Sequence, residues 1–325
     1  MRRARLRIGT RGSQLSLRQT ELVMLRLREH PPDLGLEIVV IQTSGDRAPH
    51  VPLEQLDGIG FFAKDLEAAL LDERCDIAVH SAKDLPTEVR PGLTLAAFPV
   101  RADPRDVLIS RGAGTLDLLP AGSRIATSSL RRSAQIRHKR PDLMPVSIRG
   151  NIDTRLLKLD RGDCDALCLA GAGLVRMGWE DRVTEWLPTE TMLPAPGQGA
   201  IAVQARTGDD DVIALLGQID HQPTRAAVEA ERAFVARLGS GCRAPAAALA
   251  RVEAEDLVLE GLVATADGGV VHRHEERRPA VEADGLGASV AEYLLARAGA
   301  VLDAMRAVGA TPPGRRGAVP GTDRP

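Results

Sequence analysis

The chain has 325 residues, a length that suggests two or three domains. Hydrophobic residues make up 44% and charged residues 26%, which is the composition of a globular protein rather than a disordered one. The formal net charge of −2 and the aromatic content of 2% argue against nucleic-acid binding by overall charge or by base stacking.

Arginine greatly outnumbers lysine. Four of the 42 basic residues are lysine and 38 are arginine. A genome-wide preference for arginine codons accounts for such an excess. Only arginines at positions where local structure disfavours a positive charge therefore count as functional candidates.

Short apolar runs alternate with longer amphipathic runs over the first two-thirds of the chain. The predicted strands span 6–9, 36–42, 77–80, 93–98, 124–127, 146–149, 166–170 and 200–204. The predicted helices span 13–29, 62–71, 129–139, 154–161 and 210–219. This alternation is typical of βαβ units, so the expected fold class is α/β with largely parallel sheets.

The last third of the chain shows a different order of predicted elements, which indicates a smaller α+β domain. We expect helices over 226–238 and 288–308, strands near 257–264 and 270–273, and a disordered tail. Two Pro-rich passages, 98–104 and 193–199, are expected to cross between domains. If the strand after Gly199 returns to the first sheet, two α/β domains share a double hinge and a ligand cleft. The expected boundaries are 1–99 with 200–217, 100–199, 218–310, and a tail over 311–325.

The cysteines and the N-terminus point to a reducing compartment. Cys75, Cys164, Cys168 and Cys242 are too few for a disulfide scaffold and fit no common zinc spacing, and we expect no metal. Burial as free thiols is the expectation for Cys164 and Cys168. Because the N-terminus lacks the apolar core of a signal peptide and no apolar run reaches bilayer length, we expect a cytoplasmic protein with no membrane partner.

Two arginines stand where acidic residues are usual. Arg131 and Arg132 fall in the first turn of a predicted helix, beside the hydroxyls of Thr127, Ser128 and Ser129. Since a helix N-terminus carries partial positive charge, such a cluster repels itself unless an anion neutralises it. The alternative is that both side chains reach solvent.

Further cations gather at other strand ends and helix starts. Arg149 closes a strand, Asn151 is placed to cap the next helix, and Arg155 lies early in it. Arg11 precedes Ser13, which like Ser129 is placed as the N-cap of the following helix, and Arg176 follows Gly173. Because guanidinium groups match carboxylates bidentately, the pattern predicts a polyanionic ligand that carries phosphate or several carboxylates.

One acidic residue lies at the end of another predicted strand. Ser81, Lys83 and Asp84 follow the apolar run that ends at His80. A Lys–Asp pair at a turn is usually a surface ion pair. At the mouth of an arginine-lined cleft, however, the carboxylate can stabilise a cation formed in a reaction or move a proton. Cys242, in a Gly-Ser-Gly loop beside Arg243, has a possible covalent role, although an ordinary loop cysteine is the default.

These segments together resemble the porphobilinogen deaminase family. The matching motifs are Thr43-Ser44-Gly45-Asp46, His80-Ser81-Ala82-Lys83-Asp84-Leu85-Pro86, Asp103-Pro104-Arg105-Asp106, Ala126-Thr127-Ser128-Ser129-Leu130-Arg131-Arg132, Arg149-Gly150-Asn151-Ile152-Asp153-Thr154-Arg155, Pro196-Gly197-Gln198-Gly199-Ala200, Glu231-Arg232 and the Cys242 loop. They occur in order between about residues 5 and 308, and it is the ordered set that is specific.

The resemblance implies a transferase of porphyrin (heme) biosynthesis with two hinged α/β domains like those of periplasmic binding proteins and a third α+β domain. It implies a dipyrromethane cofactor joined to Cys242 by a thioether. Four porphobilinogen molecules are added head to tail with loss of ammonia, and hydrolysis releases hydroxymethylbilane. A monomer without nucleic-acid or membrane partners is expected.

The resemblance also assigns roles to residues. Asp84 would be catalytic, stabilising the cation left when ammonia departs. Incoming substrate would bind Arg11, Ser13 and Arg176. The cofactor or the growing chain would bind Ser81, Lys83, Thr127, Ser129, Arg131, Arg132, Arg149, Asn151 and Arg155.

Some positions depart from the family pattern. Ile59 replaces a common lysine, Ser240 a common glycine, and Ala244 and Ala246 larger apolar residues, which leaves the packing of the cysteine loop open. The main alternative is a hinged two-domain anion-binding receptor without catalysis, which would need export and has no use for a loop cysteine. A phosphate-handling transferase is a second alternative, weakened because the Gly58–Gly60 loop lacks a P-loop ending.

Overall fold

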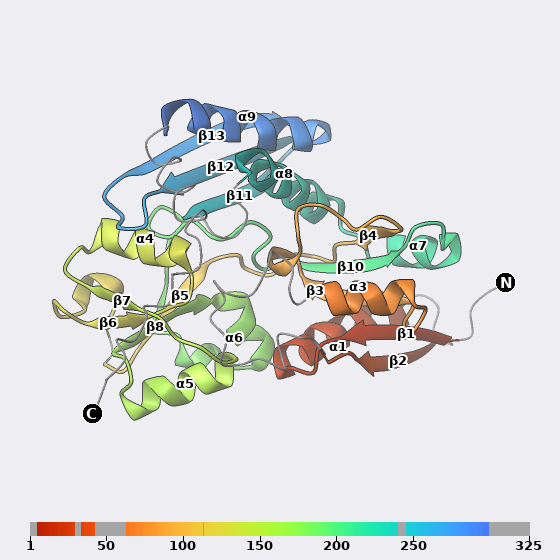
Figure 1. The fold of residues 1–325 in the computed structure, drawn as a ribbon, viewed down its shortest axis with the longest axis horizontal. Coiled ribbons are helices and arrows are strands. Elements are labelled where there is room, and N and C mark those ends of the chain that lie inside the picture. The colour runs from red at the N-terminus through yellow and green to blue at the C-terminus, as the bar shows by residue number, and fades with distance from the viewer. Residues whose placement is uncertain (1–4, 30–33, 43–62, 113, 240–244, 299–325) are drawn as a thin grey trace, which may run out of the picture.

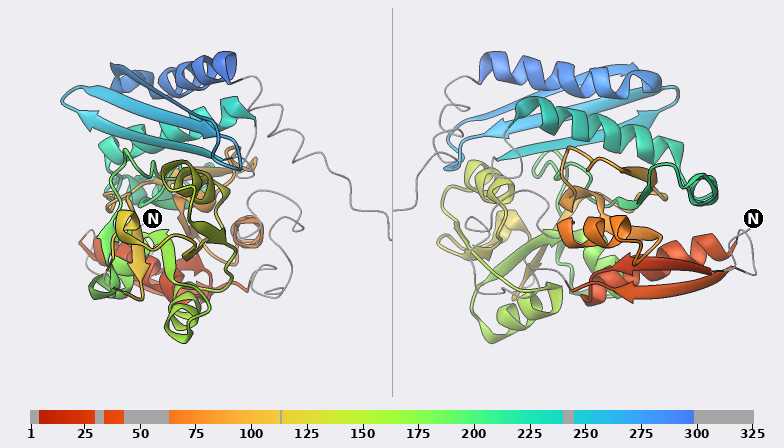
Figure 2. Two further views of the ribbon diagram at one scale, coloured as in Figure 1. Left: turned by 90° about the vertical axis from the view of Figure 1, so that its left-hand side faces the viewer. Right: turned by 45° about the vertical axis from the view of Figure 1, so that its right-hand side comes forward.

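Three β-sheets organise the part of the chain that the structure describes. The structure, a computed structural model, describes residues 5–29, 34–42, 63–112, 114–239 and 245–298. Two five-stranded sheets lie beside each other, and a three-stranded sheet with its helices lies on one side of both (Figures 1 and 2). This arrangement confirms the expected α/β fold with a smaller C-terminal α+β part.

The first sheet has the strand order β2-β1-β3-β10-β4. Its strands are β1 (Arg5–Thr10), β2 (Gly35–Val40), β3 (Ile77–Ser81), β4 (Leu93–Ala97) and β10 (Ile201–Arg206). Apolar side chains of α1 (Gln14–Arg28) and α7 (Asp210–Gly217) pack in one core with this sheet, and α3 (Lys64–Leu71) packs in a separate core. The strand after Gly199, β10, lies in the first sheet, which is the condition stated above for a double hinge.

The second sheet has the order β7-β6-β8-β5-β9. Its strands are β5 (Asp106–Ser110), β6 (Arg124–Ala126), β7 (Met144–Val146), β8 (Ala166–Ala170) and β9 (Glu185–Trp186). Side chains of α5 (Ile152–Arg161) and α6 (Gly171–Met177) fill one core beside it, and α4 (Leu130–Lys139) contributes to another. Both sheets are therefore covered on two faces.

The third sheet is an antiparallel meander. It consists of β11 (Ala246–Glu253), β12 (Asp256–Ala264) and β13 (Val271–Pro279), with α8 (Gln222–Leu238) and α9 (Ala283–Arg297) packed on it. A second core, with Ala134 of α4 and Leu193, joins it to the rest of the molecule. Short 3-10 turns complete the described elements: η2 (Ala82–Asp84), η3 (Leu116–Leu118), η4 (Glu180–Arg182) and η6 (Ala280–Glu282).

The expectation of largely parallel sheets is wrong in part. In the first sheet β1 pairs in parallel with β2 and β3, but β10 runs antiparallel to β3 and β4. In the second sheet β6 pairs in parallel with β7 and β8, but β5 runs antiparallel to β8 and β9. The antiparallel strands β5 and β10 directly follow the two Pro-rich crossings. Because each enters its sheet from the neighbouring one, neither is oriented by a βαβ crossover.

Several element bounds also differ from the prediction. The strand predicted over 146–149 occupies Met144–Val146, because the chain then leaves the sheet and buried Ile148 packs beside α5. The third-sheet helix begins at Ala283 rather than 288, and residues 299–325 lie outside the described part. Two of the three predicted caps are confirmed: Ser13 Oγ accepts a hydrogen bond from Ser16 N, and Ser129 Oγ from Arg132 N. The third is wrong in part, because Asn151 occupies the N-cap position of α5 but its side chain makes no capping hydrogen bond.

Candidate active site

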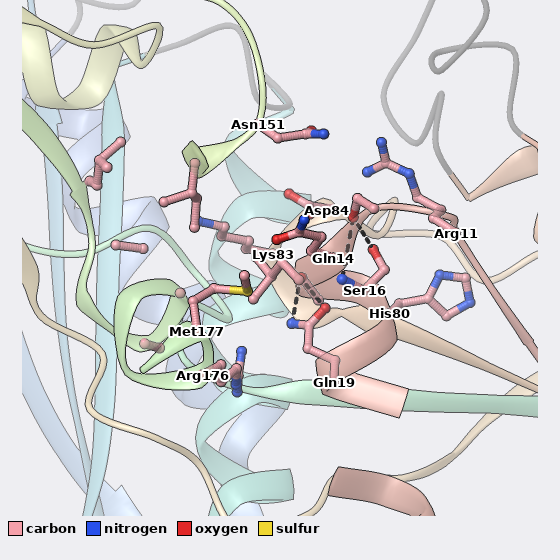
Figure 3. A pocket seen from close by; sticks show the side chains of 18 of the residues that line it. Arg11, Gln14, Ser16, Gln19, His80, Lys83, Asp84, Asn151, Arg176 and Met177 are labelled. Atoms are coloured by element: carbon pink, nitrogen blue, oxygen red, sulfur yellow. Dashed lines mark hydrogen bonds between the residues drawn. The ribbon is translucent and has the colours of Figure 1, made fainter. Parts of the chain in front are cut away.

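A cavity of about 990 Å³ lies between the first and second sheets. The ends of β1 and β3 and the start of α1 line it from one side, and β8, α5 and α6 line it from the other. Figure 3 shows side chains from both sheets around this space. Of the predicted site residues, the cavity is lined by Arg11, Ser13, Ser81, Lys83, Asp84, Arg132, Arg149, Asn151, Arg155 and Arg176.

Three described site residues of the prediction are not among those lining the cavity. Thr127 is buried, and its Oγ1 accepts a hydrogen bond from Ser129 N at 3.3 Å. Ser129 itself caps α4. Arg131 is buried behind the cavity wall. Cys242 lies outside the described residues, as do Ile59, Ser240 and Ala244.

Lys83 and Asp84 lie in the η2 turn directly after β3. Burial lowers the pKa of Lys83 to about 8; the nearby Asp84 carboxylate opposes this shift, and the positive charge of Arg132 adds to it. Asp84 is exposed toward the cavity. The turn therefore presents a weakly basic amine and a carboxylate side by side, which fits binding an anion and stabilising a cation in one place.

Two arginines in the cavity wall donate to backbone carbonyls. Arg155 Nε donates to Gly150 O at 2.8 Å, and Arg176 Nη2 donates to Gly199 O at 2.7 Å. Burial lowers the pKa of each to about 10, and for Arg155 the charges of Arg132 and Arg149 contribute. A guanidinium whose pKa is lowered in this way is strongly stabilised by an incoming anion. The cavity is thus suited to carboxylate ligands.

An internal carboxylate neutralises the arginine pair at the start of α4. Arg131 Nη1 donates to Asp106 Oδ2 at 2.6 Å, and Arg132 donates to Asp106 Oδ1 through Nε at 3.0 Å and Nη2 at 2.7 Å. Burial alone would raise the pKa of Asp106, but the two guanidinium groups outweigh it and hold that pKa well below 3.8. The prediction that this pair requires an anion is correct, but Asp106 already provides one, and only Arg132 reaches the cavity.

Polar groups of α1 and α5 complete the walls. Gln19, on α1, donates through Nε2 to Ser81 Oγ at 2.9 Å. Ser13 Oγ lies 2.8 Å from Ser16 Oγ while it caps α1. Asn151 occupies the N-cap position of α5, but its side chain makes no capping hydrogen bond there, and it is exposed at the cavity. Its amide is therefore available to a ligand.

Sequence reasoning missed three polar residues of this region. Asp106, Gln19 and Gln198 are buried and hydrogen-bonded, and each contacts a predicted site residue. Asp106 had a signal, because a carboxylate directly before the apolar run Val107–Ile109 needs a partner when that run becomes a buried strand. Gln198 lay within the quoted motif Pro196–Ala200 but was given no role, and Gln19 had no signal, since the partners of both glutamines are distant in sequence.

The other expectations concern cysteines, metals and membranes. Cys75, Cys164 and Cys168 are buried free thiols, as predicted for the latter two. Within the described ranges, no group of three or more His, Cys, Asp or Glu side chains is arranged to hold a metal ion. Among the helices of those same ranges, none combines the length and apolar character needed to cross a bilayer.

Comparisons with known proteins agree with the geometry of the site. Residues 6–214 match the family model described as porphobilinogen deaminase, dipyromethane cofactor binding domain, and residues 225–296 match the model of the C-terminal domain of the same enzyme. The porphobilinogen deaminase of Syntrophus aciditrophicus is 48% identical over 297 residues, covering 91% of this chain and 97% of that protein. The one of Roseiflexus castenholzii is 47% identical, with coverages of 91% and 98%.

Solved structures give a weaker likeness. The VFT2 domain of BvgS from Bordetella pertussis matches with a TM-score of 0.41 and 16% identity, over 66% of this chain and 86% of that one. The two family models together span most of the described residues, and the relatives match nearly end to end. The chain belongs to the porphobilinogen deaminase family.

Proposed function

We propose that the protein condenses four porphobilinogen molecules head to tail onto a dipyrromethane cofactor, releasing ammonia and then hydroxymethylbilane. This is hydroxymethylbilane synthase activity, a transferase reaction of tetrapyrrole biosynthesis. The observation that carries the proposal is the cavity that the exposed carboxylate of Asp84 shares with Lys83, Arg155 and Arg176, each of which has a lowered pKa. A non-catalytic anion receptor has no need of that carboxylate.

The residues present fit the cofactor. Each of its two pyrrole rings carries an acetate and a propionate, so four carboxylates need cationic or hydrogen-bonding partners. Arg132, Arg149 and Arg155, with Asn151, offer such partners from the second sheet. Ser81 and Lys83 offer them from the first sheet. When bound, the cofactor would supply the free pyrrole position to which the first new unit is joined, and each later unit would join the pyrrole added before it.

The incoming porphobilinogen is assigned to a different set of lining residues. Arg11 and Ser13 lie at the start of α1, and Arg176 lies on α6. Two cations that line the same cavity match the two carboxylates of one pyrrole. In this arrangement the substrate is held by its acids while its aminomethyl carbon remains free to react.

Asp84 is the proposed catalytic residue. Its carboxylate stabilises the positive charge that develops on the substrate as the carbon–nitrogen bond breaks and ammonia leaves. It then accepts the proton that the newly joined pyrrole carbon must lose. Lys83, beside it, holds a ligand carboxylate away from Asp84, so the cation keeps its own counter-charge.

Attachment of the cofactor is tested by the mass of the intact protein. Protein made in cells that produce porphobilinogen should carry an excess mass equal to a dipyrromethane on Cys242. Cys242→Ala should lose it, while Cys164→Ala, at a buried thiol outside the cavity, should keep it. A bare polypeptide mass for the unsubstituted protein would remove the covalent cofactor from the proposal.

The role of Asp84 is tested by a matched pair of variants. Asp84→Asn should keep the cofactor mass but lose turnover by about 100-fold or more, because the developing cation loses its counter-charge. Asp153→Asn removes a carboxylate from α5, elsewhere on the cavity wall, and should keep most of the activity. Similar rates for the two variants would contradict a catalytic role for Asp84.

The domain limits, the location and the assembly state are part of the same proposal. We propose domains over 1–99 with 200–217, 100–199 and 218–310, a disordered tail over 311–325, and a cytoplasmic monomer without nucleic-acid or membrane partners. The sheet memberships of β4, β5 and β10 support the first two limits. Light scattering on the purified full chain measures the assembly state, and a dimer mass would contradict the monomer.

A further inference from the structure

The second Pro-rich crossing, residues 193–199, contains one buried glutamine, Gln198, between the two large sheets. Gln198 is 1% exposed and lies between two glycines with left-handed backbone, Gly197 at φ +74° and Gly199 at φ +85°. A Cβ on Gly197 would lie 3.0 Å from Lys83 N, and one on Gly199 would lie 2.5 Å from Ala102 O. The backbone on both sides of Gln198 therefore has little room to shift.

The side-chain amide of Gln198 is fully engaged. Its Nε2 donates to Pro104 O at 2.7 Å and to Asp106 Oδ1 at 2.8 Å. Its Oε1 accepts from Lys83 Nζ and from Arg132 Nη2, both at 3.4 Å. A flipped amide would turn its N–H groups toward two cations and its oxygen toward two acceptors, so the observed orientation is the only one its partners allow.

This amide joins groups from both sides of the cavity. Lys83 follows β3 of the first sheet, while Asp106 and Arg132 belong to β5 and α4 of the second. In the assignments above, Gln198 has no contact with substrate or cofactor. We propose that Gln198 is a positioning residue that holds the Lys83 ammonium at the cavity and ties it to the Asp106–Arg132 ion pair across the hinge. The inference rests on the proposed function only in taking Lys83 as a ligand-binding group.

The charged groups around Lys83 define what loss of the amide should do. Asp84 and Asp106 stabilise the ammonium, while burial, Arg132 and Arg131 disfavour it. The Gln198 oxygen is a further acceptor, so it also stabilises the charged form. Without this acceptor the charged form of Lys83 is less stable, so its pKa should fall further. A carboxylate in place of the Gln198 amide should instead raise the pKa of Lys83.

The test follows the ionisation of Lys83 directly. Reductive methylation of the full, cofactor-bearing protein at a series of pH values, read by peptide mass spectrometry, gives an apparent pKa for each lysine. The chain has only three others, Lys64, Lys139 and Lys158, which serve as internal references. Gln198→Met should lower the Lys83 midpoint by about half a unit to one unit, and Gln198→Glu should raise it by a similar amount.

Gln135→Met is the matched control. Gln135 is equally buried and also holds the second crossing, accepting from Leu193 N at 2.8 Å and donating to Leu193 O at 3.1 Å, but it has no hydrogen bond with Lys83. It should reduce thermal stability as Gln198→Met does while leaving the Lys83 midpoint unchanged.

Activity provides an independent readout. Gln198→Met should raise KM more than it lowers kcat, because a ligand-binding cation is misplaced while Asp84 is kept. Shifts of the same sign in both Gln198 variants, or an equal shift in Gln135→Met, would overturn the positioning role. Failure of the cofactor-mass experiment would instead refute the proposed function and leave the Lys83 titration interpretable.

Discussion

Replacement of Asp106 by asparagine tests the reasoning about the buried ion network. Asp106 is fully buried and accepts four hydrogen bonds, three from Arg131 and Arg132 and one from Gln198. Asparagine keeps the shape but leaves two guanidinium groups, with side chains only 5% and 8% exposed, without a charge partner. Breaking such a buried pair costs about 3–5 kcal/mol of unfolding free energy.

The assay uses the placement of the tryptophans. Both of them, Trp179 and Trp186, pack in the core of the second sheet, so their fluorescence during urea unfolding reports on the part that contains Asp106. Asp103→Asn is the control, because the side chains of Asp103 and Arg105 are 33% and 42% exposed and their ion pair should contribute less than about 1 kcal/mol.

The pH dependence sharpens this prediction. Because Arg131 and Arg132 hold the pKa of Asp106 below its ordinary 3.8, its contribution is fully present above that pH and is lost as the pH falls through the lower folded-state pKa. The deficit of Asp106→Asn should therefore be constant near neutrality and shrink in acid. A deficit near neutrality no larger than that of Asp103→Asn would refute the argument.

Two further predictions concern the crossing and a buried imidazole. Gly199→Ala should lower Tm several-fold more than the control Gly208→Ala. Both sites have φ +85°, which costs alanine about 1 kcal/mol, but only at Gly199 does the new Cβ meet a backbone oxygen. Equal losses in Tm would contradict this reasoning. Burial lowers the pKa of His80 from 6.5 to about 4, so stability is full above pH 6.5 and falls by about 3 kcal/mol as the pH drops to about 4. His80→Gln should remove most of the fall in unfolding free energy between pH 6.5 and about 4, measured by urea unfolding at a series of pH values. An unchanged pH dependence would show that His80 is not its source.

Local signals in the sequence predicted the parts of the site that depend on near neighbours. The caps Ser13 and Ser129 and the cluster of arginines at strand ends follow from spacing within a few residues. Each of these rests on backbone rules that hold without tertiary information. The return of the chain to the first sheet was instead a condition of the expected double hinge, because the Pro-rich crossing at 193–199 does not fix which sheet the next strand joins.

Non-local contacts were not predictable in the same way. The counter-ion of Arg131 and Arg132 lies on β5, a strand that the sequence analysis did not assign. The low pKa of Lys83 arises from burial, and its hydrogen-bond partner Gln198 lies more than 110 residues later in the chain. Strand direction was mispredicted for the same reason, because it depends on where β5 and β10 enter their sheets.

The position of β10 between β3 and β4 in the first sheet has a consequence for the order in which the protein folds during synthesis. Within the described part of that sheet, β3 and β4 do not pair with each other, and both pair with β10. The ribosome makes β10 only after every strand of the second sheet, whose strands all lie between Asp106 and Trp186. All strands of the second sheet are therefore synthesised before the first sheet has its full set. Until residues 201–206 emerge, the edges of β3 and β4 that pair with β10 stay unpaired.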